Sequence, residues 1–291
     1  MNPPPVAAPQ AFNFRLRLLR IGFRTVGRVF PSMAAKLAFR IFSTPRLRAK
    51  HRQSDDIIER ARVFELLFGG IFLKCYEWGN AAQPTILLIH GWESRGTALR
   101  SFVPDLLAKG FRVVTFDGPA HGDSGGKRTH LLNFAGAIKA IFQNIGEVEG
   151  VVAHSFGGSA VAYSMAYIAP SIRIKKLVLI AAPASVEKMF ENYVQLIAAP
   201  SAVASELKKL GENRIQMPLA NSDLIQTLGK INVSHTLLIH DREDDVVPFR
   251  NAEAIAARWE HIYLFATRGF GHFRLVKNPE VIAKVVDFLT L

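Results

Sequence analysis

A serine at residue 155 stands where an apolar run meets a helical segment. The residues from Val151 to Gly158 read VVAHSFGG. A serine on a sharp strand-to-helix turn presents its hydroxyl to a substrate, but the strained backbone there tolerates only small residues two positions to either side. Ala153 and Gly157 satisfy that condition. The segment therefore predicts that Ser155 is a nucleophile on such an elbow; the alternative is a serine that only caps a helix.

A nucleophilic serine needs a general base, because its hydroxyl stays protonated at neutral pH. Of the nine histidines, His272 lies in the glycine-bearing loop GFGHF, between the last predicted strand and the last predicted helix. Loops at strand ends are where catalytic side chains are commonly held. His154 adjoins the serine, but we expect its ring to point to the other side of the turn. His272 is therefore the candidate base.

The base in turn needs a carboxylate that orients its ring, and the sequence offers several. The segment HDREDDVVP follows the predicted strand Thr236–Ile239 and carries four carboxylates in five positions, at Asp241, Glu243, Asp244 and Asp245. One imidazole can be oriented by only one of them, and the others would lie in solvent. From the residues alone, the choice between Asp244 and Asp245 stays open.

Alternating strands and helices must position these residues. Apolar, β-branched runs separated by helical segments predict a mainly parallel sheet that is covered by helices on both faces. The predicted strands are Thr85–Ile89, Arg112–Phe116, Gly150–Ala153, Lys176–Ala181, Thr236–Ile239 and Ile262–Ala266. The predicted helices cover residues 97–109, 129–145, 157–168, 249–259 and 278–290.

Two further segments extend this pattern. Arg62–Phe68 and Ile71–Trp78 flank a Gly-Gly pair, which predicts a β-hairpin ahead of the parallel strands. An insertion over residues 183–232 delays the next parallel strand, and its position makes it the candidate lid. Its predicted helices are Val186–Ile197, Ala202–Leu210 and Leu219–Leu228. Its apolar residues indicate either an apolar substrate group or a packed core, and they include Met189, Phe190, Tyr193, Leu196 and Ile197.

The chain order Ser155…Asp244…His272 resembles that of the α/β-hydrolase superfamily, over about residues 62–291. The segment after Thr236–Ile239 is similar to the acid loop G-x-x-D-x-x-V-P of that family. Alignment on Val247 and the proline after it makes Asp244 the acid in preference to Asp245. The loop departs from the family at Asp241, which stands in place of the glycine.

Two other segments match the same family. His90-Gly91-Trp92 directly follows the predicted strand Thr85–Ile89 and resembles the family's HG loop. The resemblance implies an oxyanion hole formed by the backbone N–H groups of Trp92 and Phe156. The segment 117–124, DGPAHGDS, resembles a turn that is structural in the family, with Ala120 in place of its first glycine.

The activity implied by the resemblance is that of a serine hydrolase, or serine esterase. Its catalytic triad would act on a carboxylic ester or related small acyl compound through an acyl-enzyme intermediate. A serine nucleophile argues against dehalogenase and epoxide hydrolase chemistry, which use an aspartate in this family. No cofactor and no metal are implied, since the sequence has no H-E-x-x-H or P-loop, and no G-x-G-x-x-G where one would be needed. The alternative is a catalytically inactive member that serves as a binding or scaffold protein.

The charge of the chain is concentrated at its beginning. The net charge is +12, yet residues 1–54 hold eleven Lys or Arg and no Asp or Glu, while the rest holds 25 basic and 24 acidic side chains. We therefore divide the chain into a basic extension, 1–54, and a hydrolase domain, 55–291. We expect no nucleic-acid partner, because no binding motif or stacking platform accompanies the basic residues. The lone cysteine, Cys75, excludes a disulfide framework and a multi-cysteine zinc site.

The extension contains a basic amphipathic helix that ends at Pro31, after a proline-rich stretch, 1–11, that we expect to be non-helical. A second apolar and basic segment covers Ala34–Phe42. One face of the helix groups Phe12, Leu16, Leu19, Phe23, Val26 and Phe30, opposite Arg17, Arg20, Arg24 and Arg28. That face is either buried against the hydrolase domain or in a dimer, which we slightly favour, or makes peripheral membrane contact through residues 12–42. The acid-free, arginine-rich composition also resembles a mitochondrial transit peptide, which would matter in a eukaryotic source. We expect a cytoplasmic protein, membrane-associated under the second interpretation; the oligomeric state stays open.

Overall fold

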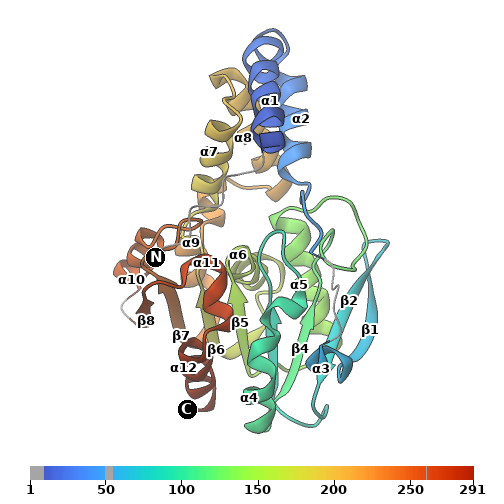
Figure 1. Cartoon of the computed structure of the whole chain (residues 1–291), viewed down its shortest axis with the longest axis vertical. Helices are drawn as coiled ribbons and strands as arrows, with labels where there is room; N and C mark the ends of the chain where they lie inside the picture. The colour runs from blue at the N-terminus through green and yellow to red at the C-terminus, as the bar shows by residue number, and fades with distance from the viewer. Residues whose placement is uncertain (1–9, 50–54, 260) are drawn as a thin grey trace. The chain divides into compact units, whose positions relative to one another are not determined.

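One mixed sheet of eight strands lies at the centre of the fold, in the spatial order β1-β2-β4-β3-β5-β6-β7-β8 (Figure 1). The computed structural model describes residues 10–49, 55–259 and 261–291, with only the backbone described for 10–13. The strands are β1 Arg62–Phe68, β2 Ile71–Trp78, β3 Thr85–Ile89, β4 Arg112–Phe116, β5 Gly150–His154, β6 Arg173–Ile180, β7 Asn232–Asp241 and β8 Ile262–Thr267. β2 pairs antiparallel with β1 and β4, and all other neighbours are parallel, so the predicted mainly parallel sheet is confirmed.

The predicted hairpin of β1 and β2 has the bounds that the sequence indicated. Its two-residue turn places Gly69 at φ +55° and Gly70 at φ +79°. Both values lie in the left-handed region that the tightest hairpin turns need and that glycine adopts without steric cost. The Gly-Gly pair is therefore the local cause of this hairpin.

Helices cover both faces of the sheet. α4 and α12 pack against each other on one face, while α5, α6, α9 and α10 follow one another on the other face (Figure 1). The helices of this part are α3 Asp56–Glu59, η1 Gly96–Phe102, α4 Val103–Ala108, α5 Leu131–Ile145, α6 Phe156–Tyr163, η2 Ser164–Ile168, α9 Leu224–Thr227, α10 Arg250–Arg258, α11 Gly271–Arg274 and α12 Pro279–Thr290. Short 3₁₀ turns complete it at η3 Leu219–Ser222, η4 Leu228–Lys230 and η5 Leu275–Lys277.

The core on the α4 and α12 face is apolar throughout. Alternate residues of the strands meet the inward sides of η1, α4 and α12 there, as the two-residue period of a strand requires. The buried side chains include Ile86, Leu88, Val113, Val152, Val178, Leu237, Leu99, Phe102, Leu106, Val281, Val285 and Leu289. This core holds the strands rigidly, so the loops at their carboxyl ends start from fixed positions.

Strand order reverses between β3 and β5. β3 lies between β4 and β5, so the chain turns to one side of β3 first and to the other side afterwards. The carboxyl ends of parallel strands at such a switch point form a natural crevice for a ligand. The loops that follow β3 and β5 carry His90-Gly91-Trp92 and Ser155, respectively.

The predicted bounds differ most from the structure in two strands and two helices. β6 begins at Arg173 and β7 at Asn232, both earlier than predicted, because the two strands pair from Arg173 and Asn232 onward although these ends are polar and exposed. The helix predicted over Ala202–Leu210 covers Ser201–Ile215. The helix predicted over Leu219–Leu228 is broken into η3, α9 and η4. Backbone pairing and local turns decide these bounds, and neither can be recognised from a pattern of hydrophobic residues.

The chain forms two compact units. Among the described residues, the first unit takes in those up to Phe42 together with Glu187–Leu219, and the second takes in those of Ser43–Val186 and Ala220–Leu291. The first unit contains α1 Gln10–Val29, α2 Pro31–Phe42, α7 Val186–Leu196 and α8 Ser201–Ile215. Part of the insertion thus shares one unit with the basic N-terminal helices.

Helix α2 forms the centre of the first unit. It packs on α1 and α8. The Tyr193 hydroxyl of α7 donates a hydrogen bond of 2.8 Å to the Ala38 carbonyl, and the Phe42 ring lies 4.8 Å from the Tyr193 ring and 5.5 Å from that of Phe190. Phe190 and Ile197 are buried. Phe190, Tyr193 and Ile197 therefore pack within this unit, as one of the two interpretations expected, whereas Leu196 is exposed.

The N-terminal helices differ from prediction in two details. α1 begins at Gln10, within the stretch 1–11 that we expected to be non-helical; residues 1–9 lie outside the described part. α2 begins at Pro31 rather than at Ala34, because a proline has no N–H to lose and a preset φ at the first position of a helix.

The predicted apolar face of α1 is also only partly buried. Phe23 is buried and Leu16 and Leu19 are half-buried, whereas Val26 and Phe30 are exposed. The side chain of Phe12 lies outside the described residues. Among residues 10–49, 55–259 and 261–291, no helix is both long and apolar enough to span a lipid bilayer.

Candidate active site

Ser155 lies on a strained turn between β5 and α6. Its backbone has φ +53° and ψ −126°, a conformation that costs a non-glycine residue free energy and that is typical of functional sites. Two contacts hold it there: its N–H donates to the Ile180 carbonyl at 2.8 Å, and the N–H of Gly158 donates to its carbonyl at 2.9 Å. A Cβ at Gly157 would lie 2.5 Å from the His90 carbonyl oxygen, so glycine is required at that position of the elbow.

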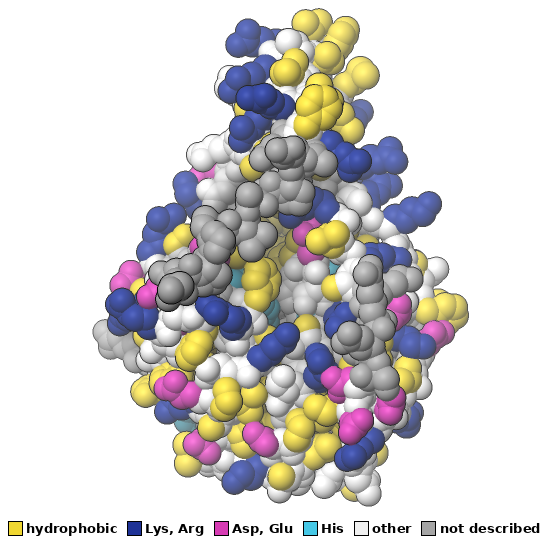
Figure 2. Space-filling view, in the orientation of Figure 1, with side chains coloured by type: hydrophobic (Ala, Val, Ile, Leu, Met, Phe, Trp, Pro, Cys, Tyr) yellow, Lys and Arg dark blue, Asp and Glu magenta, His cyan; other side chains and the backbone are white. Residues whose placement is uncertain are grey.

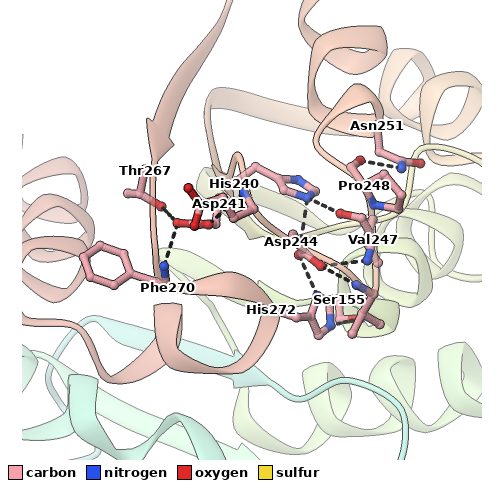
Figure 3. Close-up of polar contacts among 12 residues, drawn as sticks. Ser155, His240, Asp241, Asp244, Val247, Pro248, Asn251, Thr267, Phe270 and His272 are labelled. Atoms are coloured by element: carbon pink, nitrogen blue, oxygen red, sulfur yellow. Dashed lines mark hydrogen bonds and ion pairs between the residues drawn. The ribbon is translucent and has the colours of Figure 1, made fainter. Parts of the chain in front are cut away.

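The structure brings three of the predicted site residues into one hydrogen-bonded row (Figure 3). The His272 Nε2 lies 3.0 Å from the Ser155 Oγ, and the His272 Nδ1 lies 2.8 Å from the Asp244 Oδ2. An ionised carboxylate can only accept, so Nδ1 carries the proton and Nε2 accepts from the serine hydroxyl. The row is therefore arranged for Ser155 to lose its proton to His272.

Asp244 is held as a buried carboxylate. Its Oδ1 accepts hydrogen bonds from the backbone N–H groups of Val246 at 2.9 Å and Val247 at 2.7 Å. Burial by itself would raise the pKa of Asp244, but the hydrogen bonds from His240, His272 and the Val247 N–H outweigh it and hold that pKa well below its usual value. Asp244 is thus ionised at neutral pH.

Asp245 is exposed to solvent, next to the buried Asp244. The acid loop therefore turns one of the two adjacent carboxylates inward and the other outward. Of the two candidates that the sequence left open, the structure places Asp244 against His272.

His240 contacts the far side of Asp244. Its Nε2 lies 2.7 Å from the Val247 carbonyl oxygen and 3.4 Å from the Asp244 Oδ2 (Figure 3). Both neighbours are acceptors, so Nε2 carries the proton and donates to the loop that presents the carboxylate. The ring is fully buried, and its Nδ1 has no hydrogen-bond partner among the described residues.

Asp241, which replaces the glycine of the family motif, links the acid loop to the histidine loop. Its Oδ2 accepts from the Thr267 hydroxyl at 2.7 Å and from the Phe270 N–H at 3.1 Å, and its Oδ1 accepts from the Glu243 N–H at 3.0 Å. Phe270 lies two residues before His272. The departure from the motif thus adds a connection between the loops that carry Asp244 and His272.

Replacing Asp241 with alanine should therefore loosen the geometry of both loops. We expect the free energy of unfolding to fall by about 2–3 kcal/mol, because buried donors lose their acceptor, and kcat to fall roughly tenfold or more through misplacement of the imidazole. Thermal unfolding and steady-state kinetics measure the two effects. The matched control is Glu243→Ala on the same loop, whose exposed ion pair with Arg268 should contribute less than about 1 kcal/mol. Equal losses in the two variants would contradict the linking role.

The prediction that His154 points to the other side of the turn was wrong, because its ring lies beside His272. Its Nε2 lies 3.0 Å from the backbone carbonyl oxygen of His272, and the two rings lie 4.8 Å apart. Burial lowers the pKa of His154 to about 3, with a further contribution from the neighbouring His272. A neutral ring that donates from Nε2 can hold the backbone of the histidine loop without placing a positive charge beside the base.

The loop after β3 packs directly on the serine. A Cβ at Gly91 would lie 2.9 Å from the Ser155 Cβ, so the absence of a side chain lets the two segments approach. The rings of Trp92 and Phe156 meet edge to face at 5.5 Å. Phe156 is the first residue of α6, where the backbone N–H has no acceptor within its own helix. The two residues predicted to supply the oxyanion hole thus lie side by side, Trp92 on the loop after β3 and Phe156 at the start of α6, directly after the nucleophile.

The DGPAHGDS turn supports this loop through hydrogen bonds. The His90 Nε2 accepts from the Gly118 N–H at 2.9 Å, and the His121 Nε2 accepts from the Glu93 N–H at 3.0 Å. Asp117 accepts from the Gly96 N–H at 2.7 Å through its Oδ1. These bonds fix the loop on both sides of Trp92, which agrees with the structural role that the resemblance implied for the turn.

Sequence reasoning missed the roles of His154 and His240. His154 is 118 residues from His272, and no spacing or periodicity connects the two. For His240 one local signal existed, because it lies at the end of β7, four residues before the aspartate, where a strand end places its side chain near the loop that follows.

Comparison with known proteins identifies the family of the chain. A model described as the alpha/beta hydrolase family matches residues 86–285. A bifunctional esterase/perhydrolase of Acinetobacter calcoaceticus is 28% identical to the chain over 265 residues, which cover 74% of this chain and 93% of that protein.

Solved structures of related fold cover most of the chain as well. An esterase of Pyrococcus furiosus is similar with a TM-score of 0.62 at 20% identity, covering 84% of this chain and 95% of its own. The thioesterase domain from the curacin biosynthetic pathway is similar with a TM-score of 0.59 at 20% identity, covering 79% and 99%. Because the family model spans well over half of the residues, the resemblance seen in the motifs is confirmed, and the chain belongs to the alpha/beta hydrolase family.

Proposed function

We propose that this protein is a serine hydrolase that acts on a carboxylic ester or a related acyl compound. The observation that carries the proposal is the row Ser155–His272–Asp244, with 3.0 Å between the first pair of side chains and 2.8 Å between the second. A serine hydroxyl on a strained elbow, hydrogen-bonded to an imidazole that a buried carboxylate orients, is an activated nucleophile. The similarity to an esterase/perhydrolase agrees with this class of reaction.

The first half of the reaction acylates the serine. The Ser155 Oγ attacks the carbonyl carbon of the substrate while its proton passes to the His272 Nε2. Asp244 stabilises the imidazolium through Nδ1 and keeps the ring in the required tautomer. The tetrahedral intermediate then collapses: the bond to the leaving group breaks, and His272 returns the proton to the leaving oxygen.

The second half releases the acid. A water molecule gives a proton to the His272 Nε2 and attacks the acyl carbon, and collapse of the second tetrahedral intermediate returns the proton to the Ser155 Oγ. In both halves, negative charge develops on the carbonyl oxygen. We propose that the backbone N–H groups of Trp92 and Phe156 stabilise this charge by donating hydrogen bonds to the oxygen, each lowering the barrier by roughly 3 kcal/mol. A lid function for residues 183–232 stays a prediction.

The experiment for this proposal is a hydrolysis assay combined with covalent labelling. We expect the protein to be labelled stoichiometrically by a fluorophosphonate probe, and to hydrolyse p-nitrophenyl esters in a panel of increasing acyl length. Thioesters and lactones in the same panel define the leaving group. Absence of both labelling and turnover across the panel would contradict the proposal and favour an inactive α/β-hydrolase fold that serves as a binding or scaffold protein.

A further inference from the structure

Helix α1 carries two apolar faces, and the structure buries only one of them. Phe23 is 4% exposed on the side where α1 packs on α2 and α8. On the other side, four large apolar side chains remain in solvent. They are Phe14 at 63%, Leu18 at 54%, Ile21 at 57% and Val29 at 69% exposure.

The spacing of these four residues places them along one face. Phe14, Leu18 and Ile21 follow at steps of four and three residues, and Val29 comes two helical turns further along, at the end of α1. Phe30, between α1 and α2, and Met33 and Leu37 of α2 are exposed as well, at 54%, 68% and 52%. We refer to these seven residues as the exposed apolar surface.

Such a concentration is unusual for a solvated face. Isolated exposed apolar residues are normal on protein surfaces, but a contiguous group indicates a partner. Among the described residues, eight of the seventeen exposed large hydrophobic side chains fall between Phe14 and Leu37, a small part of the chain. Something apolar is therefore expected to cover this surface.

Basic residues border the exposed apolar surface. Arg17, Arg24 and Arg28 are exposed and lie on one flank of the strip on the helical wheel, and Arg15 lies on the other. Residues 10–42 contain seven Lys or Arg and no Asp or Glu. Figure 2 shows hydrophobic and basic side chains next to one another over α1 and α2. Arg20, in contrast, donates a hydrogen bond from its Nε to the Leu196 carbonyl oxygen at 2.8 Å.

This combination selects among the partners that could cover an apolar strip. A second copy of the same surface would bring two acid-free groups of positive charge together, which is unfavourable. A nucleic acid would satisfy the arginines but would leave the apolar strip in water. A bilayer with anionic headgroups satisfies both, because the apolar strip enters the interface and the guanidinium groups remain at the level of the phosphates.

We propose that the exposed apolar surface and its bordering arginines dock the protein on the surface of an anionic lipid bilayer. The docking face shares only Phe30 with the face that the sequence indicated. The predicted face contained Leu16, Leu19 and Phe23, which the first unit partly or wholly buries, so the structure assigns membrane contact to the opposite side of α1. Burial and membrane contact, which the sequence offered as alternatives, are divided between two faces of one helix.

The test uses the full-length protein and co-sedimentation with vesicles of phosphatidylcholine and phosphatidylglycerol at low salt. Each basic residue near an anionic surface contributes roughly fivefold to partitioning, so Arg17→Gln, Arg24→Gln and Arg28→Gln together should lower the partition coefficient on the order of 100-fold. Leu18→Ser, Ile21→Ser and Val29→Ser together should lower it at least as far. Pure phosphatidylcholine vesicles, and high salt, should weaken binding of the unmodified protein by a similar factor.

Matched variants on the second unit control for lost charge and lost hydrophobicity. Lys109→Gln, Lys127→Gln and Arg128→Gln remove three exposed basic residues, and Leu67→Ser with Phe72→Ser removes two exposed apolar residues of the hairpin. Both control variants should bind vesicles within about twofold of the unmodified protein. Because all of the substituted side chains are exposed, every variant should keep its melting temperature within a few degrees.

Two outcomes would overturn the proposal. One is unmodified protein that stays in the supernatant with anionic vesicles at low salt. The other is a dimer, seen by sedimentation velocity without lipid, that the three serine substitutions convert to monomer, since the surface would then bind a second copy. The readout is independent of catalysis: Ser155→Ala should bind vesicles as the unmodified protein does, so failure of the proposed hydrolase activity leaves this test intact.

Discussion

Ser155→Ala should lose all labelling by a fluorophosphonate probe, and its rate of ester hydrolysis should fall by roughly 10⁴- to 10⁶-fold. The expected loss is large because the variant lacks the atom that forms the acyl-enzyme bond, while the oxyanion donors and the binding surface remain. The strain at φ +53° is carried by the backbone, and alanine fits the same space. We therefore expect the melting temperature to stay within a few degrees, which separates loss of the nucleophile from loss of the fold.

Ser159→Ala is the matched control. Ser159 lies one turn further along α6 and is fully buried, and its Oγ has no hydrogen-bond partner among the described residues. Removing that hydroxyl should leave labelling and hydrolysis within about twofold, because no buried partner is left unsatisfied. Undiminished labelling of Ser155→Ala would show that another residue is the nucleophile, and the proposed mechanism would then be wrong.

The central sheet could be predicted from sequence because its strands are buried on both faces. Every residue of β3, β4 and β5 is buried, and each strand has an apolar, mostly β-branched or leucine-rich centre, which is the pattern expected of a strand covered on both faces. The ends of β6 and β7 were missed for the opposite reason. Arg173 and Asn232 are exposed and polar, and they are in strands because their backbones pair with each other.

The site was predictable where its signals are local. Ser155 and His272 lie in short segments with small flanking residues, and these segments require particular backbone shapes whatever the rest of the fold does. The contacts made by His154, His240 and Asp241 were not predictable. They connect loops that are distant in the chain, and only the folded sheet brings those loops together.

The first unit shows a further limit of pattern analysis. The sequence of α1 identifies an amphipathic helix, but it offers two apolar faces, and the partner that buries one of them, α8, begins at Ser201. Gly27 marks the buried face, since a Cβ there would lie 3.0 Å from the Val203 side chain. Without the position of α8, nothing distinguishes this glycine from Gly22, which has no atom within 4 Å of such a Cβ.

The second large effect on kcat is expected at Asp244, one of the two adjacent carboxylates of the acid loop. Asp244→Asn should lower kcat by about 10⁴-fold, as the same change does in serine proteases of unrelated fold. The asparagine Oδ1 can still accept from Val246 and Val247, which leaves the NH₂ group facing the His272 Nδ1. An amide donor there stabilises the tautomer protonated at Nε2, and Ser155 loses the acceptor for its proton. The same NH₂ group also meets the donating Nε2 of His240, so the loop itself should be destabilised.

Asp245→Asn tests the choice of acid with the same chemical change one residue away. Its side chain is exposed, so we expect kcat and the melting temperature to stay near those of the unmodified protein. Steady-state kinetics on an ester from the panel, with thermal unfolding of both variants, makes the comparison. If Asp245→Asn carried the large loss and Asp244→Asn kept its activity, the acid loop in the working enzyme would present the other carboxylate. A small loss of kcat in both variants would mean that His272 is oriented mainly by its backbone contact with His154. Adding His154→Ala to the Asp244→Asn variant should then lower kcat a second time.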